Sequence, residues 1–299
     1  MSFSKKVNLY EVGPRDGLQN EKNIIPTKIK LKFIRKLIDC NFKHIEIGSF
    51  VSAKWVPQMS DSEKIVDAIE KLEGVSFPVL TPNLKGAVSA IKKKADTICV
   101  FASASEEFSK RNTNCSVTES MKRIEEVIDE AKKNNVKIRG YLSCVLGCPY
   151  EGKISYEKTS ELANFLIDKG CYEISLGDTI GCGTPTEALK LFEKISKSIN
   201  IKKVAAHFHD TYGQALANIY AVLQLGVQTI DTSIAGLGGC PYAKGAKGNV
   251  ATEDVLYMLN GMGIDTGLNL KDIIKVSWFI SDYLKRSPKS RVTQTLGRK

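Results

Sequence analysis

The strongest constraint on the fold is an alternation of short apolar β-rich segments with longer amphipathic ones, repeated eight times. Each strand-then-helix unit spans about 30 residues, so the count and length predict a (β/α)8 barrel, also called a TIM barrel. A doubly wound parallel sheet is the alternative, but it usually has about five or six strands. The candidate strands begin near Val7, His44, Ser76, Thr97, Lys137, Tyr172, Lys203 and Thr229.

Between these strands, apolar residues recur every three or four positions, which is typical of helices with one buried face. Ser155 and Thr184 stand where helix N-caps are expected, and Gly170 and Gly226 stand where helices should end. The predicted helices include residues 27–39, 61–71, 118–134, 156–169, 186–198 and 214–225.

The chain length and the even composition predict one domain. No Pro- or Ser-rich linker divides the 299 residues, so we expect a single catalytic barrel over residues 1–299. Residues 265–299 should form a C-terminal helical extension and tail, with a helix over roughly 270–284 outside the barrel.

The net charge of +10 bears on possible partners. Basic residues are spread along the chain, as on a solvated surface, although a positive field also favours a polyanionic ligand such as CoA. No recognition motif or interleaved aromatic residues accompany the charge, so we expect no nucleic-acid partner.

Hydropathy and cysteine usage predict a cytoplasmic protein. No apolar run reaches the roughly 18 residues that cross a bilayer, so no membrane partner is expected. The start of the chain has no signal-peptide pattern. None of the eight cysteines forms a C-x-x-C pair, and most are expected to be reduced and buried.

In a barrel of this kind, the functional site lies where the strands end. The seventh strand ends in His207-Phe208-His209, and alternation along a strand places both histidines on one face. Two imidazoles at the expected site indicate metal binding. Arg15 and Asp16 follow the first strand, although alone this pair would be read as a turn with a surface ion pair.

A glycine-dense segment, AGLGGCPYA, follows the eighth strand at residues 235–243. Glycines allow the backbone to approach a ligand and to move, and Cys240 within this loop is suited to act as a proton donor. A phosphate-binding loop is the rival interpretation, but no G-x-x-x-x-G-K-[ST] pattern is present.

With these motifs in place, the chain resembles the 3-hydroxy-3-methylglutaryl-CoA lyase family from about Val7 to about Leu270. The arginine–aspartate pair and the two histidines also occur in related barrel aldolases and condensing synthases, whereas the GLGGCPY loop points to the lyase. The matching stretches are EVGPRDGLQNEKN (11–23), SFVSAKWVPQM (49–59), VLTPNLKG (79–86), GCPYEGKIS (147–155), GCYEISLGDTIG (170–181), HDTYGQALAN (209–218) and AGLGGCPYA (235–243).

The resemblance implies a role for each site residue. The metal ligands would be Asp16, His207, His209 and Asn249. Arg15 would contact the acyl group of the substrate, and Cys240 would be the catalytic thiol. The site would be completed by the supporting or substrate-binding carboxylates Glu46 and Asp178, with Lys22 and Lys85 toward CoA.

The implied reaction is cleavage of 3-hydroxy-3-methylglutaryl-CoA into acetyl-CoA and acetoacetate, a step of leucine degradation and ketone body formation. The implied ligands, oxygen and imidazole with open positions, favour Mg²⁺ or Mn²⁺ over a closed zinc site. Asp16 or His207 would remove the hydroxyl proton, and the sequence does not choose between them. A homodimer is also implied. A related acyl-CoA condensing synthase or 2-oxo acid aldolase is the alternative.

Overall fold

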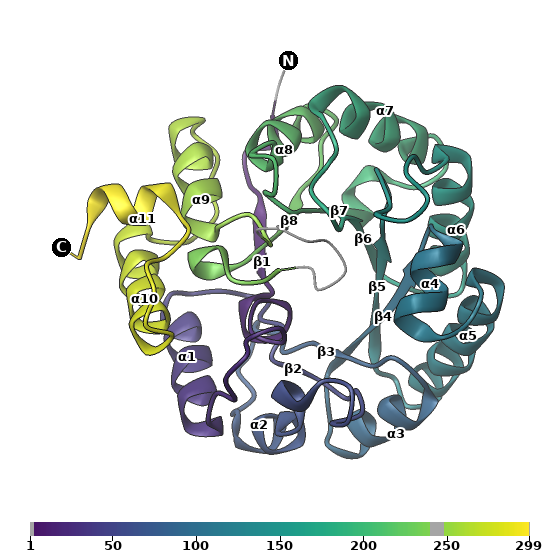
Figure 1. Ribbon diagram of the computed structural model, residues 1–299, viewed down its shortest axis with the longest axis horizontal. Coiled ribbons are helices and arrows are strands. Elements are labelled where there is room, and N and C mark those ends of the chain that lie inside the picture. Colours follow the sequence, from purple (N-terminus) through teal and green to yellow (C-terminus); the bar gives the residue numbers. More distant parts are fainter. Residues whose placement is uncertain (1–2, 240–247, 299) are drawn as a thin grey trace.

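The computed structural model describes residues 3–239 and 248–298 and contains eight parallel strands in one curled sheet (Figure 1). The strand order is β1-β8-β7-β6-β5-β4-β3-β2. Glu11 accepts the backbone N–H of Glu46 and donates its own N–H to the carbonyl of His44, so β1 also meets the segment before β2. The strands are β1 (Asn8–Glu11), β2 (Gly48–Ser49), β3 (Val79–Leu80), β4 (Thr97–Ser103), β5 (Lys137–Ser143), β6 (Glu173–Asp178), β7 (Val204–Phe208) and β8 (Thr229–Thr232).

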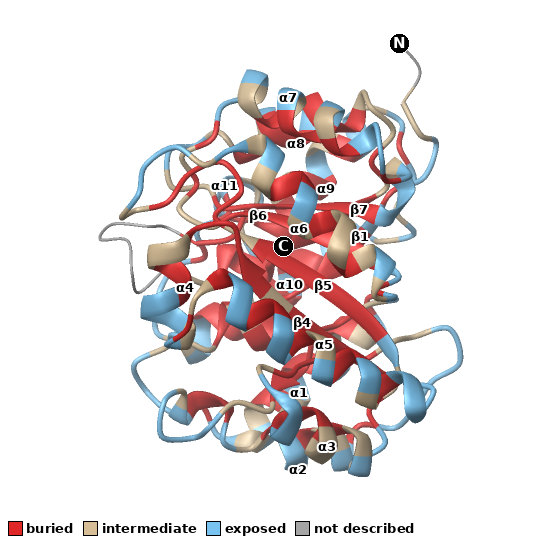
Figure 2. Cartoon of the chain, turned by 90° about the vertical axis from the view of Figure 1, so that its right-hand side faces the viewer, coloured by how far each residue is buried: buried red, intermediate tan, exposed pale blue. Residues whose placement is uncertain are grey.

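Helices surround the sheet, with buried faces toward the strands and exposed faces outward (Figure 2). This arrangement confirms the predicted eight-stranded parallel α/β architecture. The helices are α1 (Thr27–Asp39), α2 (Ser62–Ala68), α3 (Leu84–Lys92), α4 (Glu106–Thr113), α5 (Val117–Lys133), α6 (Tyr156–Asp168), α7 (Pro185–Ser196), α8 (Ala215–Leu223), α9 (Thr252–Gly261), α10 (Leu270–Tyr283) and α11 (Arg291–Leu296).

The helix termini follow the predicted capping residues. The Ser155 hydroxyl accepts the N–H of Lys158 at the start of α6, and the Glu187 carboxylate accepts the N–H of Thr184 at the start of α7. Gly170 and Gly226 adopt φ values of 110° and 92° just after α6 and α8, a backbone region that glycine enters without steric cost.

The second and third strands are much shorter than the predicted segments that begin at His44 and Ser76. Each contains only two residues of regular ladder, and single bridges join His44 to Ser76 and Glu11 to Ile45. Pro78 has no N–H to donate, so it cannot continue a ladder through this segment. The predicted strands were therefore too long, although both segments take their expected places in the sheet order.

The C-terminal helices lie on one side of the barrel (Figure 1). Helix α10 packs against α1 and α9, and α11 packs against α9 and α10. Within residues 3–239 and 248–298, no helix is both long enough and apolar enough to cross a bilayer.

Candidate metal and active site

The Arg15–Asp16 pair occupies a tight π-helical turn, η1 (Gly13–Gly17), directly after β1. The Glu11 side chain accepts the N–H of Gly13 and so fixes the start of the turn. A Cβ atom on Gly17 would lie 2.8 Å from Cβ of Leu237, so only glycine lets the turn approach the segment after β8. The turn thus directs two charged side chains over the end of the barrel where the strands finish.

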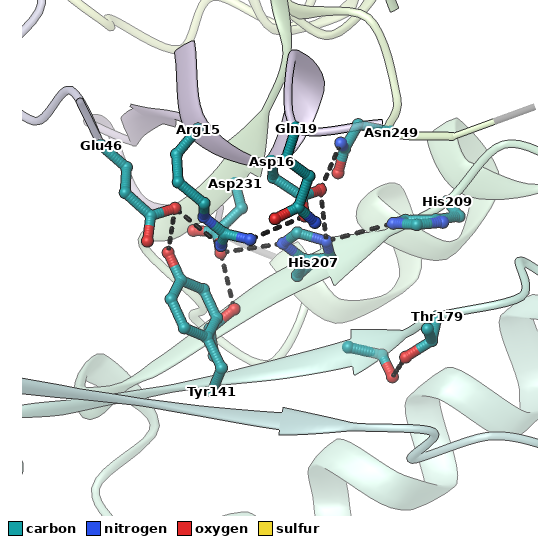
Figure 3. A network of polar contacts seen from close by, with 12 residues as sticks. Arg15, Asp16, Gln19, Glu46, Tyr141, Thr179, His207, His209, Asp231 and Asn249 are labelled. Carbon is teal, nitrogen blue, oxygen red and sulfur yellow. Dashed lines mark hydrogen bonds and ion pairs between the residues drawn. The ribbon is translucent and has the colours of Figure 1, made fainter. Parts of the chain in front are cut away.

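The two histidines at the end of β7 face the same side, as predicted (Figure 3). Their Nε2 atoms lie 3.3 Å apart, and Phe208 between them packs outward against Phe192 of α7. Nε2 of His207 is also 4.0 Å from Oδ2 of Asp16. One ligand atom from each of Asp16, His207 and His209 lies within 4.8 Å of the others, which is a spacing that could hold a metal ion.

Asn249 lies beside this group because its backbone bridges to that of His209. Its Nδ2 donates to Oδ2 of Asp16 at 2.7 Å and to the carbonyl of Leu237 at 3.2 Å. The structure therefore brings Asn249 to the predicted place, but with the amide nitrogen toward the carboxylate. Ligation of a cation through Oδ1 requires rotation of this amide.

Arg15 is buried and joins two carboxylates. Nη1 contacts Oδ1 of Asp16 at 2.8 Å, and Nη2 contacts Oε2 of Glu46 at 2.7 Å. The hydroxyl of Tyr141 donates to the same Glu46 oxygen at 3.1 Å, and the guanidinium lies 5.4 Å from the centre of the Tyr141 ring. These contacts fix the planar fork of Arg15 near the three possible metal ligands.

The charges of the site act on one another. Burial opposes ionisation of Arg15, but Glu46 and Asp16 outweigh it and raise its pKa above the ordinary value. Burial likewise raises the pKa of Glu46, and Arg15 offsets part of this effect. For Asp16, burial is outweighed by Arg15 and the two histidines, so its pKa is lowered and it stays ionised. Burial, with His207 alongside, lowers the pKa of His209 to about 4, which favours the neutral ring that can bind a metal.

The donor set fits a divalent cation. An ionised carboxylate and two imidazoles converge within 4.8 Å, and such oxygen and nitrogen donors bind divalent metal ions. Nε2 of His209 faces the Nε2 of His207, so these two nitrogens are the ones placed to ligate.

Asp178 is placed differently from the other predicted site residues. Its buried carboxylate accepts the backbone N–H groups of Cys182 and Gly183 at 3.2 and 2.8 Å and thereby shapes the loop after β6. Lys22 and Lys85 are exposed. Cys240 lies outside the described residues, so its predicted place at the site rim stays a prediction.

Four polar residues that support the site were not predicted from the sequence; they lie on β5, on β8 and just after the η1 turn. Gln19 donates to Oδ1 of Asp16 at 3.2 Å, and Asp231 contacts Nδ1 of His207 at 3.1 Å. The other two are Tyr141 and Arg139. The sequence did contain a signal for the pairing of Arg139 with Asp231. These residues carry opposite charges inside strand patterns, where an unpaired buried charge costs much free energy.

Comparison with known proteins identifies the family. A profile described as HMGL-like matches residues 6–280. The chain belongs to the HMGL-like family. It is 51% identical over 293 residues to a protein named hydroxymethylglutaryl-CoA lyase, mitochondrial, from Gallus gallus, covering 98% of both chains. It is 52% identical over 288 residues to a human protein named 3-hydroxy-3-methylglutaryl-CoA lyase, cytoplasmic, covering 96% of this chain and 78% of that one.

Solved structures agree with this assignment. A hydroxymethylglutaryl-CoA lyase from Pseudomonas aeruginosa matches with a TM-score of 0.96, 49% identity and 99% coverage of both chains. An HMG-CoA lyase from Acinetobacter baumannii, solved with coenzyme A and 3-methylmalate, matches with a TM-score of 0.94 and 32% identity, covering 98% and 96%. The family resemblance seen in the sequence is confirmed.

Proposed function

We propose that this chain cleaves 3-hydroxy-3-methylglutaryl-CoA into acetyl-CoA and acetoacetate at the site formed by Arg15, Asp16, His207 and His209. The observation that carries the proposal is the convergence, within 4.8 Å, of ligand atoms from segments more than 190 residues apart. Relatives named as lyases for this substrate are about half identical to the chain over almost its whole length.

The reaction breaks the bond between the second and third carbons of the acyl chain. The hydroxyl on the third carbon loses its proton and becomes the ketone of acetoacetate, while the bonding electron pair passes to the thioester as an enolate. We assign removal of this proton to the Asp16 carboxylate, since Nδ1 of His207 already contacts Asp231 and its Nε2 faces the proposed cation. The Arg15 guanidinium, already fixed by Glu46, stabilises the negative charge that develops on the enolate oxygen.

Asp16, His207 and His209 would hold a divalent cation, with Asn249 as a further ligand after rotation of its amide. Bound there, Mg²⁺ or Mn²⁺ would make the substrate hydroxyl more acidic and orient the substrate by chelation. A mixed oxygen and imidazole ligand set with open positions suits these two ions better than a closed zinc site does.

Protonation of the enolate carbon completes the reaction, and we assign it to the thiol of Cys240. The segment before Cys240 begins at the site, because Leu237 contacts Asn249 and the carbonyl of Gly239 accepts a hydrogen bond from Asn20. Asp178 supports the loop after β6, and Lys22 and Lys85 provide positive charge for the CoA portion.

One experiment tests both the reaction and the cation. The enzyme is stripped of metal with a chelator and assayed with 3-hydroxy-3-methylglutaryl-CoA after addition of Mg²⁺, Mn²⁺ or Zn²⁺ in turn. We expect acetoacetate formation only after metal addition, and most with Mg²⁺ or Mn²⁺. Condensation of a 2-oxo acid with acetyl-CoA, in place of cleavage, would support a synthase instead.

Further aspects of the proposal concern the assembly and the compartment. We propose one catalytic domain with α10 and α11 as its C-terminal extension, assembled as a homodimer in a reducing compartment such as the cytoplasm. All seven described cysteines are free, and six are buried, as expected for reduced thiols. Relatives carry both mitochondrial and cytoplasmic names. Light scattering coupled to gel filtration would measure the assembly, and a monomer mass would contradict the dimer.

A further inference from the structure

Beneath the site, Asp231 of β8 joins His207 to the interior of the barrel (Figure 3). The parallel register between β7 and β8 sets His207 directly beside Asp231. Nδ1 of His207 lies 3.1 Å from Oδ2 of Asp231, and the Ser175 hydroxyl donates to the same oxygen at 2.7 Å. Asp231 is almost fully buried, so the contact is shielded from water.

The position of Asp231 is fixed by Arg139 of β5. Nη2 of Arg139 contacts Oδ1 of Asp231 at 2.7 Å, and Nη1 contacts Oδ2 at 3.2 Å. Nε of Arg139 donates to Glu173 at 2.7 Å, and its guanidinium lies 3.9 Å from the ring centre of Tyr10 and 4.9 Å from that of Tyr141. A planar guanidinium held on two edges and near two rings leaves Asp231 little freedom to turn.

These contacts determine which nitrogen of His207 carries its proton. An ionised carboxylate only accepts hydrogen bonds, so the contact with Asp231 requires a proton on Nδ1 of His207. Nε2 then presents a lone pair toward Asp16 and His209. By contrast, Nδ1 of His209 has no hydrogen-bond partner among the described residues, so no carboxylate orients that ring as Asp231 orients His207.

We propose that Asp231, oriented by Arg139, is a positioning residue that holds His207 in the Nδ1–H tautomer, so that Nε2 is set as a metal ligand before any metal binds. The role as a metal ligand rests on the proposed function, whereas the tautomer does not. A carboxylate behind a ligand histidine fixes the ring and increases the basicity of the ligating nitrogen.

The first test reads the tautomer directly in the metal-free enzyme. The chain has only three histidines, so ¹⁵N-histidine labelling gives three ring spin systems in long-range ¹H–¹⁵N spectra. At alkaline pH we expect His207 to show a protonated Nδ1 and a bare Nε2. A proton on Nε2 of His207 would overturn the proposal without any variant, even if the enzyme binds metal and turns over normally.

The second test measures metal affinity. We expect Asp231→Asn to weaken Mn²⁺ binding, followed by electron paramagnetic resonance of the free ion, by about 10- to 100-fold, and to reduce the Nδ1–H population of His207. Glu173→Gln is the matched control, because it removes the charge of the other buried partner of Arg139 and leaves the Asp231–His207 contact in place. Its Mn²⁺ affinity should stay within about threefold of the parent value.

Thermal unfolding shows whether each variant is folded. If Asp231→Asn does not fold, Ser175→Ala replaces it, since this change removes one donor from the same Asp231 oxygen and should give a smaller loss in the same direction. Equal Mn²⁺ affinity in a folded Asp231→Asn variant and the parent would refute the positioning role. Absence of Mn²⁺ binding by the parent would instead refute the proposed metal site.

Discussion

Glu11 allows a stability prediction whose size follows from the structure. This carboxylate is fully buried at the end of β1, where it accepts the N–H groups of Gly13 and Ile234 and the hydroxyl of Thr252. It therefore ties the η1 turn to the segment after β8 and to the start of α9. Burial raises the pKa of Glu11 from 4.5 to about 8, even though the N–H of Ile234 and the hydroxyl of Thr252 oppose the rise.

The sign of the effect on stability follows from proton binding. Between about pH 4.5 and pH 8 the folded protein keeps a proton on Glu11 that the unfolded chain has released. The free energy of unfolding therefore contains a contribution from Glu11 that is full below about pH 4.5 and is lost as pH rises toward 8. Since one pKa unit corresponds to about 1.4 kcal/mol, the loss between pH 5 and pH 8 is at most about 4 kcal/mol.

The perturbation is Glu11→Gln, which keeps the shape and one acceptor oxygen but cannot ionise. We expect the stability of the variant to fall less with rising pH than that of the parent. Urea unfolding at intervals from about pH 5 to pH 8 measures this difference, with the metal removed so that ligand binding does not contribute. Glu119→Gln on α5, a half-exposed carboxylate, is the control.

The comparison uses the difference between parent and variant, so the titration of groups that do not interact with Glu11 cancels. Glu253, whose pKa burial raises to about 7, interacts with Glu11 and contributes to the rise in the Glu11 pKa. The contrary result is that the free energies of unfolding of the parent and Glu11→Gln change with pH in parallel, with the same slope against urea concentration. That result would show that Glu11 ionises as easily in the folded protein as in the unfolded chain, and it would refute the reasoning.

Three further predictions concern the site. Arg15→Lys should lower kcat by about 100-fold or more in the cleavage assay, because an ammonium cannot reproduce the fork that reaches Asp16 and Glu46; a loss below tenfold would show that the fork is not needed. His209→Ala should weaken Mn²⁺ binding strongly and change the unfolding temperature of the metal-free protein only slightly. Unchanged binding by titration calorimetry would remove His209 from the ligand set. Cys240→Ser should unfold at the parent temperature yet lose most turnover, and near-normal turnover would exclude the thiol as proton donor.

The sequence predicted best where a local rule determines the structure. Helix α1 has the predicted bounds 27–39 because its apolar repeat is a local signal. Helix α6 begins at the predicted cap because the Ser155 side chain acts within the first turn. Strands β2 and β3 were predicted too long, because ladder length depends on the partner strand and on Pro78. Helix α9 is the helix of the eighth predicted unit, but its bounds were not predicted.

The ligand residues could be predicted for a different reason. Alternation along a strand is enough to place His207 and His209 on one face, and the barrel rule brings that face to the same rim as Asp16. The orientation of the Asn249 amide could not be predicted, because it depends on the carbonyl of Leu237, which the chain brings alongside only after folding. The pairing of Arg139 with Asp231 is likewise long-range and spans 92 positions.

The barrel interior shows why such a pairing is present at all. Arg139 is fully buried, and removing a guanidinium and two carboxylates from water costs free energy that their mutual attraction only partly recovers. In other proteins, replacing buried ion pairs by apolar side chains of similar volume is often neutral or stabilising, so stability alone does not account for these residues. What an apolar core could not supply is a fixed acceptor behind His207. The polar interior is therefore best understood as the support that orients the site above it.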